Sequence, residues 1–274
     1  MAETVNQTGA LLVDGGTADD APGHAPSGRG ETGQRQPGPV LARWLWPPRC
    51  LVCRGRGAGG LDLCQPCAHA LPWLGSACLR CAIPLPGATP GPAMVCGACL
   101  QRPPPLAETH AACLYGAPLD RLLPRFKFHH DLAVGRLLAQ LMARALHPMT
   151  TAWSQPAALL PVPLHPRRLR QRGYDQALEL ARPLAHALQL PLLTGALART
   201  RDTTPQSRLH AAQRQHNLKD AFQIDRAGRS AALPAHVVLV DDVMTTGATL
   251  HAAADALQRA GVARVDAWVC ARVP

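Results

Sequence analysis

The apolar positions between residue 108 and the C-terminus predict alternating strands and helices. Four largely apolar segments have the length of strands, at 111–115, 157–162, 236–241 and 264–271. Between them, apolar residues recur every three or four positions, which predicts amphipathic helices over 131–147, 174–190 and 248–260. The run at 236–241 lacks polar alternation and therefore suits a strand buried on both faces. This order of elements predicts an α/β fold with a parallel sheet.

Two segments of this region are less regular. Pro183 lies within the predicted helix over 174–190, where we expect it to kink or break the helix. The segment 209–219 is polar and compatible with a helix.

Residues 1–40 have a different composition, dominated by Gly, Pro, Thr, Asp and Glu with little periodicity. This composition predicts a disordered tail, although an interaction role for it stays open. Two arginines against five acidic residues give the tail a charge of −3. Because the formal net charge of the whole chain is +10, the rest of the chain carries +13. The chain thus divides into a tail over 1–40, a cysteine-rich module over 41–105 and an α/β domain over 108–274.

The module over 41–105 contains four C-x-x-C pairs, Cys50/Cys53, Cys64/Cys67, Cys78/Cys81 and Cys96/Cys99. A segment this short, rich in Gly and Pro, cannot bury much apolar surface and needs another source of stability. Zinc binds four thiolates as a tetrahedron, and its binding free energy becomes folding free energy. Eight thiolates therefore predict a double zinc-ribbon module with two structural Cys₄ sites, whose closed coordination leaves no position for catalytic water.

The pairing of the cysteines is open at this stage. Sequential pairing leaves inner gaps of 10 and 14 residues, which suit two zinc ribbons in series, and interleaved pairing is the alternative. Redox dithiols explain four pairs within 50 residues less well. Cys113 and Cys270 stand alone in apolar strand patterns, so we expect them outside the metal sites.

The chain shows no sign of export or of a membrane span. Its N-terminus lacks a basic start followed by an apolar stretch, and the uncharged stretches 81–101 and 145–166 are broken by several prolines. Together with the C-x-x-C pairs, this favours a cytoplasmic location.

Positive charge is concentrated in arginine, since only Lys127 and Lys219 of the 28 basic residues are lysine. Between Arg43 and Arg102, six arginines face the single acid Asp62, a charge of +5. A basic zinc module favours contact with nucleic-acid phosphates, and Arg54, Arg56 and Arg80 would then share one basic face with the α/β domain. The alternative is that these arginines offset the negative charge of zinc–thiolate sites.

The segment Val237–Leu250 has the arrangement of an anion site. Asp241 and Asp242 end the predicted buried strand, and a small-residue loop leads into the next helix through Thr245, Thr246, Gly247, Ala248 and Thr249. The N-terminus of a helix favours a phosphate, glycine permits close approach of the backbone, and carboxylates accept hydrogen bonds from sugar hydroxyls. The segment therefore predicts a site for ribose 5-phosphate, the alternative being an acidic strand end followed by a threonine cap.

This segment resembles the phosphoribosyl pyrophosphate (PRPP) motif of type I phosphoribosyltransferases. Four other patches resemble the ComF family: Arg125–Phe128, Pro161–Pro163 with Arg168 and Arg172–Gln176, Arg201–Gln206 with Leu209, and Arg214–Asn217 with Ala221-Phe222. The resemblance implies a zinc module joined to a type I phosphoribosyltransferase fold that binds PRPP with Mg²⁺. Its pyrophosphate-loop and lid candidates are Lys127, Pro163, Arg168, Arg172 and Arg201.

The chain departs from the family at two positions, with Asp202 where lysine is frequent and Asp175 where asparagine is common. The segment 199–217 would form a flexible lid over the site. No catalytic residue or general base can be identified from the sequence.

Three functions fit these observations. The first is a phosphoribosyltransferase with an unidentified acceptor. The second, implied by the family resemblance, is a competence protein that handles single-stranded DNA, together with the DNA-uptake machinery, in natural transformation. The third is a regulator that retains the fold without turnover.

Overall fold

The computed structural model describes residues 48–85, 87, 94–150, 153, 157–202, 221–225 and 233–274. Within it, residues from Arg43 to the C-terminus form one compact unit. The tail over 1–40, the segment 209–219 and most of the expected lid lie outside the described residues.

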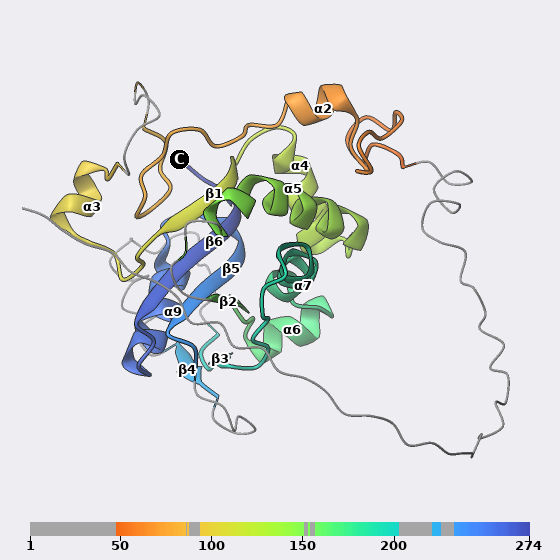
Figure 1. Ribbon diagram of the computed structural model, residues 1–274. Coiled ribbons are helices and arrows are strands. Elements are labelled where there is room, and N and C mark those ends of the chain that lie inside the picture. Colours follow the sequence, from red (N-terminus) through yellow and green to blue (C-terminus); the bar gives the residue numbers. More distant parts are fainter. Residues whose placement is uncertain are drawn as a thin grey trace, which may run out of the picture. The chain divides into compact units, whose positions relative to one another are not determined.

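A parallel sheet of four strands in the order β1-β6-β5-β2 forms the centre of this unit (Figure 1). The strands are β1 (Thr109–Leu114), β2 (Ala157–Pro161), β5 (His236–Met244) and β6 (Arg264–Arg272). The side chains of β5 and β6 are almost all buried, as expected for strands covered on both faces. All four carboxyl ends therefore meet at one edge of the sheet.

Helices cover the two faces of the sheet (Figure 1). One face packs against α4 (Leu119–Phe128), α5 (Leu132–Thr150) and α7 (Gln176–Leu188). The other packs against α9 (Ala248–Arg259) and a small antiparallel pair, β3 (Leu197–Arg199) with β4 (Phe222–Ile224). The short helix α6 (Pro166–Arg172) joins β2 to α7.

The cysteine-rich module, with α2 (Gln65–His69) and α3 (Gly97–Gln101), shares its core with the α/β part. Leu61, Leu63 and Leu71 belong to the same buried cluster as α4 and α5. Two arginines of the α/β part also donate to backbone carbonyls of the module, from Arg125 Nη1 to Leu51 at 2.7 Å and from Arg272 Nε to Cys81 at 2.8 Å.

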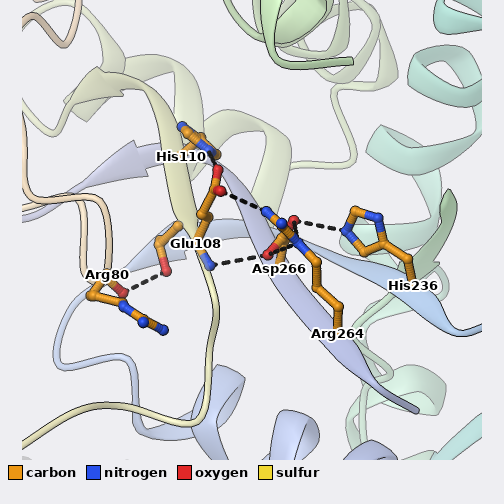
Figure 2. A network of polar contacts seen from close by, with 7 residues as sticks. Arg80, Glu108, His110, His236, Arg264 and Asp266 are labelled. Carbon is orange, nitrogen blue, oxygen red and sulfur yellow. Dashed lines mark hydrogen bonds and ion pairs between the residues drawn. The ribbon is translucent and has the colours of Figure 1, made fainter. Parts of the chain in front are cut away.

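A polar network ties together the amino ends of β1, β5 and β6 (Figure 2). His236 Nε2 lies 2.8 Å from Asp266 Oδ2, and both side chains are buried. Arg264 pairs with Asp266 at 3.0 Å and with Glu108 at 2.6 Å, and Glu108 in turn contacts His110. This network lies at the opposite edge of the sheet from Asp241 and Asp242.

The structure contains all four predicted strands and the three predicted amphipathic helices, with shifted ends. β5 continues past Asp241 to Met244, because its backbone stays paired with β6. α7 runs through Pro183 as one helix, so the chain does not break there, and buried positions on both sides of the proline pack on the sheet. The short elements α4, α6, β3 and β4 were not predicted.

Candidate functional site

A cleft of about 660 Å³ opens at the carboxyl ends of β2 and β5. Its walls come from the end of α4, the loop after β2, α6, the start of α7, β3 and the loop from β5 to α9. It brings together every residue that the sequence predicted for phosphoribosyl or pyrophosphate contact, except one: Arg201 is exposed and does not line the cleft.

The two adjacent carboxyl groups at the end of β5 lie beside one cation. Lys127 Nζ, from α4, lies 2.9 Å from Asp242 Oδ2, and the Asp242 side chain is 8% exposed. The N–H of Asp242 donates to Asp241 Oδ1 at 2.8 Å. Burial and the charge of Asp242 raise the pKa of Asp241, whereas Lys127 lowers it. The pair thus offers carboxyl oxygens to a ligand in a setting where negative charge is only partly balanced.

The loop after β5 requires glycine at one position. Gly247 has φ +78° and stands at the N-cap of α9. A larger residue would be strained at this φ, and its Cβ, 2.5 Å from Met244 Cε, would have to displace the end of the Met244 side chain. The turn places Thr245, Thr246 and the N-terminus of the 12-residue helix α9 in the cleft. Helix N-termini favour anions because their first N–H groups lack partners within the helix.

Helix α6 contributes guanidinium groups to another wall of the cleft. Arg172 Nη1 donates to Gln176 Oε1 at 2.6 Å, and its guanidinium lies 5.4 Å from the centre of the Phe128 ring. Arg168 Nε donates to Asp202 Oδ1 at 3.1 Å. Arginines so placed can bind phosphate oxygens with two parallel hydrogen bonds.

Arg199 is a further cation of this wall, which we expected from the sequence only as the start of the lid. It lies on β3, lines the cleft, and is stacked 5.4 Å from the centre of the Phe222 ring. Burial and the nearby Arg168 cation lower its pKa. The sequence carried no signal for this position, because the contact depends on the pairing of β3 with β4.

Asp175 has a structural role beside the cleft. Its Oδ1 accepts from the N–H of Leu178 at 3.2 Å and so caps α7, while Oδ2 accepts from the N–H of Leu164 at 3.1 Å. Burial raises its pKa, and these N–H donors oppose the rise. The carboxylate therefore fixes the loop after β2, which contains Pro163, against the start of α7.

The eight paired cysteines form two clusters in sequential order, Cys50, Cys53, Cys64 and Cys67, then Cys78, Cys81, Cys96 and Cys99. Within each cluster the sulfurs all lie within 4.8 Å of one another, with Cys53–Cys64 at 3.5 Å and Cys81–Cys96 at 3.8 Å. A tetrahedron of Zn–S bonds of about 2.3 Å has edges of about 3.8 Å, so the thiols fit zinc.

The remaining cysteine chemistry agrees with metal ligation. All ten cysteines lie in the described part of the chain and are free of disulfides. Cys113 and Cys270 lie buried on β1 and β6, outside both clusters, as predicted.

One of the arginines expected on a shared basic face lies elsewhere. Arg80 Nη1 donates to the Leu106 carbonyl at 3.0 Å, close to the network at the amino ends of the strands (Figure 2). Arg80 therefore does not extend the cleft, while Arg54 and Arg56 are exposed on the zinc module. In the part of the chain that the structure describes, no helix is both long enough and apolar enough to cross a membrane.

Comparison with known proteins agrees with both halves of the molecule. Family profiles described as a double zinc ribbon domain and a phosphoribosyl transferase domain match residues 41–115 and 173–274. The chain is 36% identical over 233 residues to the DNA utilization protein YhgH of Salmonella typhimurium, covering 82% of this chain and 97% of that protein. It is 34% identical over 230 residues to Competence protein F of Haemophilus influenzae, covering 82% and 96%. To Competence protein ComFC of Bacillus subtilis it is 28% identical over 158 residues, covering 58% and 61%. The chain therefore belongs to the ComF family and joins a double zinc ribbon to a domain of the phosphoribosyltransferase fold.

Proposed function

We propose that the cleft binds PRPP, or a related ribose 5-phosphate group, together with Mg²⁺, and that the protein transfers the phosphoribosyl group to an acceptor still to be identified. The observation that carries the proposal is the placement of two carboxyl groups directly before a glycine-dependent turn at the N-terminus of α9, within one cleft. A sugar phosphate needs both parts, acceptors for its hydroxyls and N–H donors for its phosphate.

Under this proposal, each wall of the cleft contacts a different part of PRPP. The 5-phosphate contacts Thr245–Thr249, and the ribose hydroxyls donate to Asp241 and Asp242. The pyrophosphate then faces Lys127 and the arginines of α6. Cations fixed where negative charge builds up on the leaving group stabilise the transition state, so this wall favours departure of pyrophosphate.

The carboxyl pair also fits a divalent cation. Carboxylate oxygens are ligands that Mg²⁺ prefers, and Asp241 and Asp242 place two carboxyl groups side by side in the cleft. Bound there with the ligand, Mg²⁺ would supply positive charge for the leaving pyrophosphate. Asp241 and Asp242 are the residues that would hold or orient it.

The test is the double variant Asp241→Asn with Asp242→Asn, titrated with PRPP and Mg²⁺ by calorimetry. Each hydrogen bond lost to a charged group is worth about 1.5–3 kcal/mol, so PRPP affinity should fall by at least tenfold. Asp255→Asn, an exposed carboxylate on α9 outside the cleft, is the matched control. Unchanged PRPP affinity in a folded double variant would refute the assignment.

A second candidate function is the handling of single-stranded DNA, and one surface favours it. Helix α6 carries four arginines and no acid in seven residues. Next to it, Phe128 is 61% exposed and lies under the Arg172 guanidinium. A basic strip beside an exposed ring suits a strand whose bases stack and whose phosphates contact arginine. Relatives named for DNA utilization and competence agree with this reading.

This second candidate is tested by the salt dependence of binding to single-stranded DNA. Each phosphate contact contributes about −0.7 to the log–log slope. Arg167→Gln with Arg170→Gln should make the slope shallower by about 1 to 1.5, and Phe128→Ala should weaken binding without changing the slope. Arg136→Gln, on the exposed side of α5, is the control. Equal effects of control and α6 variants would show that the strip is not the DNA contact.

A further inference from the structure

Arginines at the edge of the cleft converge on a single carboxylate, that of Asp202. Arg168 Nε donates to Asp202 Oδ1 at 3.1 Å, and Arg167 Nη1 lies 3.9 Å from Asp202 Oδ2. The side chains of Arg168 and Asp202 are both only 23% exposed, so water screens their interaction weakly. Arg199 is near enough for the charges of both Arg168 and Asp202 to act on it.

The carboxylate links two walls of the cleft. Arg168 comes from α6, just after the loop that follows β2, whereas Asp202 comes from the segment that follows β3. Carboxylates and phosphates bind guanidinium groups with the same fork-shaped geometry. Arg168 therefore cannot give its Nε hydrogen to Asp202 and to a phosphate oxygen at the same time.

The formal charge of the cleft indicates how much this competition affects the binding of anions. Its lining has four cations against three carboxyl groups, a net +1. The cations are Lys127, Arg168, Arg172 and Arg199, and the carboxyl groups are Asp175, Asp241 and Asp242. Asp202 adjoins the lining through Arg168 and adds one negative charge, and its second partner Arg167 adds one positive charge, so the sum stays at +1. A cleft with so small a net positive charge attracts a highly charged anion less than its arginines alone would.

We infer that Asp202 sets the affinity of the cleft for pyrophosphate, because its carboxylate competes with phosphate oxygens for Arg168. The identity of the ligand rests on the proposed function, but the competition itself rests on the Arg168–Asp202 contact. When pyrophosphate leaves, Asp202 takes its place on Arg168, which favours release. Asp202 is thus a residue that determines specificity without contacting the sugar.

The experiment compares wild type with Asp202→Asn, using inorganic pyrophosphate and ribose 5-phosphate as separate probes in calorimetry without Mg²⁺. Asp202→Asn should bind pyrophosphate about tenfold more tightly, since it frees one charge-assisted hydrogen bond, and should change ribose 5-phosphate affinity by less than about twofold. Glu179→Gln removes a carboxylate from an exposed pair with Arg182 at 3.2 Å outside the cleft, and should change neither affinity.

A second variant separates the contact from a general effect of charge. In an Arg168→Gln background the gain from Asp202→Asn should vanish, because the competing groups no longer share a donor. A gain that persists in that background, or that Glu179→Gln reproduces, overturns the inference.

The two probes also separate this inference from the proposed function. Wild type that binds ribose 5-phosphate, with no gain in pyrophosphate affinity from Asp202→Asn, overturns the role of Asp202 and leaves the proposed function standing. A gain for pyrophosphate in a protein that does not bind ribose 5-phosphate supports the role of Asp202 and contradicts the proposed function.

Discussion

At the scale of single residues, Glu108 makes the stability of the fold depend on pH. Its Oε2 lies 2.9 Å from His110 Nε2 and its Oε1 lies 2.6 Å from Arg264 Nη2 (Figure 2). These contacts outweigh burial and lower the pKa of Glu108 to about 2. Because the folded-state pKa lies below the unfolded value of about 4.3, the stabilisation is complete above that pH and is lost as the pH falls toward 2.

We therefore expect Glu108→Gln to lower the free energy of unfolding by about 2 kcal/mol at pH 7, after allowing for partial exposure of the pair. At pH 3 the difference between variant and wild type should be smaller, since the unfolded wild type is then protonated. Urea denaturation at both pH values measures this. Glu179→Gln, in an exposed pair, should cost less than 1 kcal/mol at either pH. An equal cost of Glu108→Gln at both pH values would contradict the linkage.

Individual site residues were predictable where the chain supplies them consecutively. Asp241 through Thr249 form one strand-to-helix turn, and residues that are consecutive in the chain must lie close together. The eight thiols were predictable because each C-x-x-C pair is local. Asp202 was not predicted as a partner of Arg168, because this contact is made between segments about 30 residues apart. The position of Arg80 likewise depends on how the module packs.

At the scale of elements, one carboxylate joins the loop after β2 to helix α7. Asp175 accepts from the N–H groups of Leu178 and Leu164 through its two different oxygens. Asp175→Ala should cost about 2–3 kcal/mol, the loss of a cap together with an unsatisfied buried N–H group. Asp175→Asn keeps one acceptor and should cost about half as much.

Chemical denaturation of the two variants measures this difference. Asp120→Ala is the matched control, because Asp120 lies exposed in the first turn of α4 without capping it through its side chain. It should cost less than 1 kcal/mol, the magnitude of a charge near a helix N-terminus. Equal costs for Asp175→Ala and Asp120→Ala would show that the bridge to Leu164 contributes nothing.

The elements that were predicted are those with long and regular apolar patterns. Helix α4 carries its buried leucines and Phe126 at three- and four-residue spacing, a signal that was present but short and interrupted by Pro124. Helix α6 has no buried residue, so no apolar periodicity marks it. The three-residue strands β3 and β4 are stabilised by pairing with each other. Because the two strands are far apart in the sequence, no local pattern predicts this pairing.

At the scale of the whole molecule, the zinc module and the α/β part belong to one compact unit. Their side chains share a buried cluster in which Leu63 and Leu71 belong with the apolar faces of α4 and α5. Arg125 strengthens the junction, because it pairs with Asp131 at 2.7 Å and also donates to the Leu51 carbonyl. The module therefore supports α4, which carries Lys127 into the cleft.

Removal of zinc should accordingly destabilise the cleft as well as the module. Structural zinc contributes about 10–16 kcal/mol of binding free energy, comparable to the whole stability of a typical domain. Chelation should therefore raise hydrogen exchange not only around the cysteines but also at the amides of α4 and of β1, which bonds to the module through Thr109 and Leu114. Hydrogen exchange with mass spectrometry measures both regions, and zinc added back to the same sample is the control. Fast exchange confined to residues 48–101, with α4 and β1 still protected, would show instead that the α/β part folds without the metal.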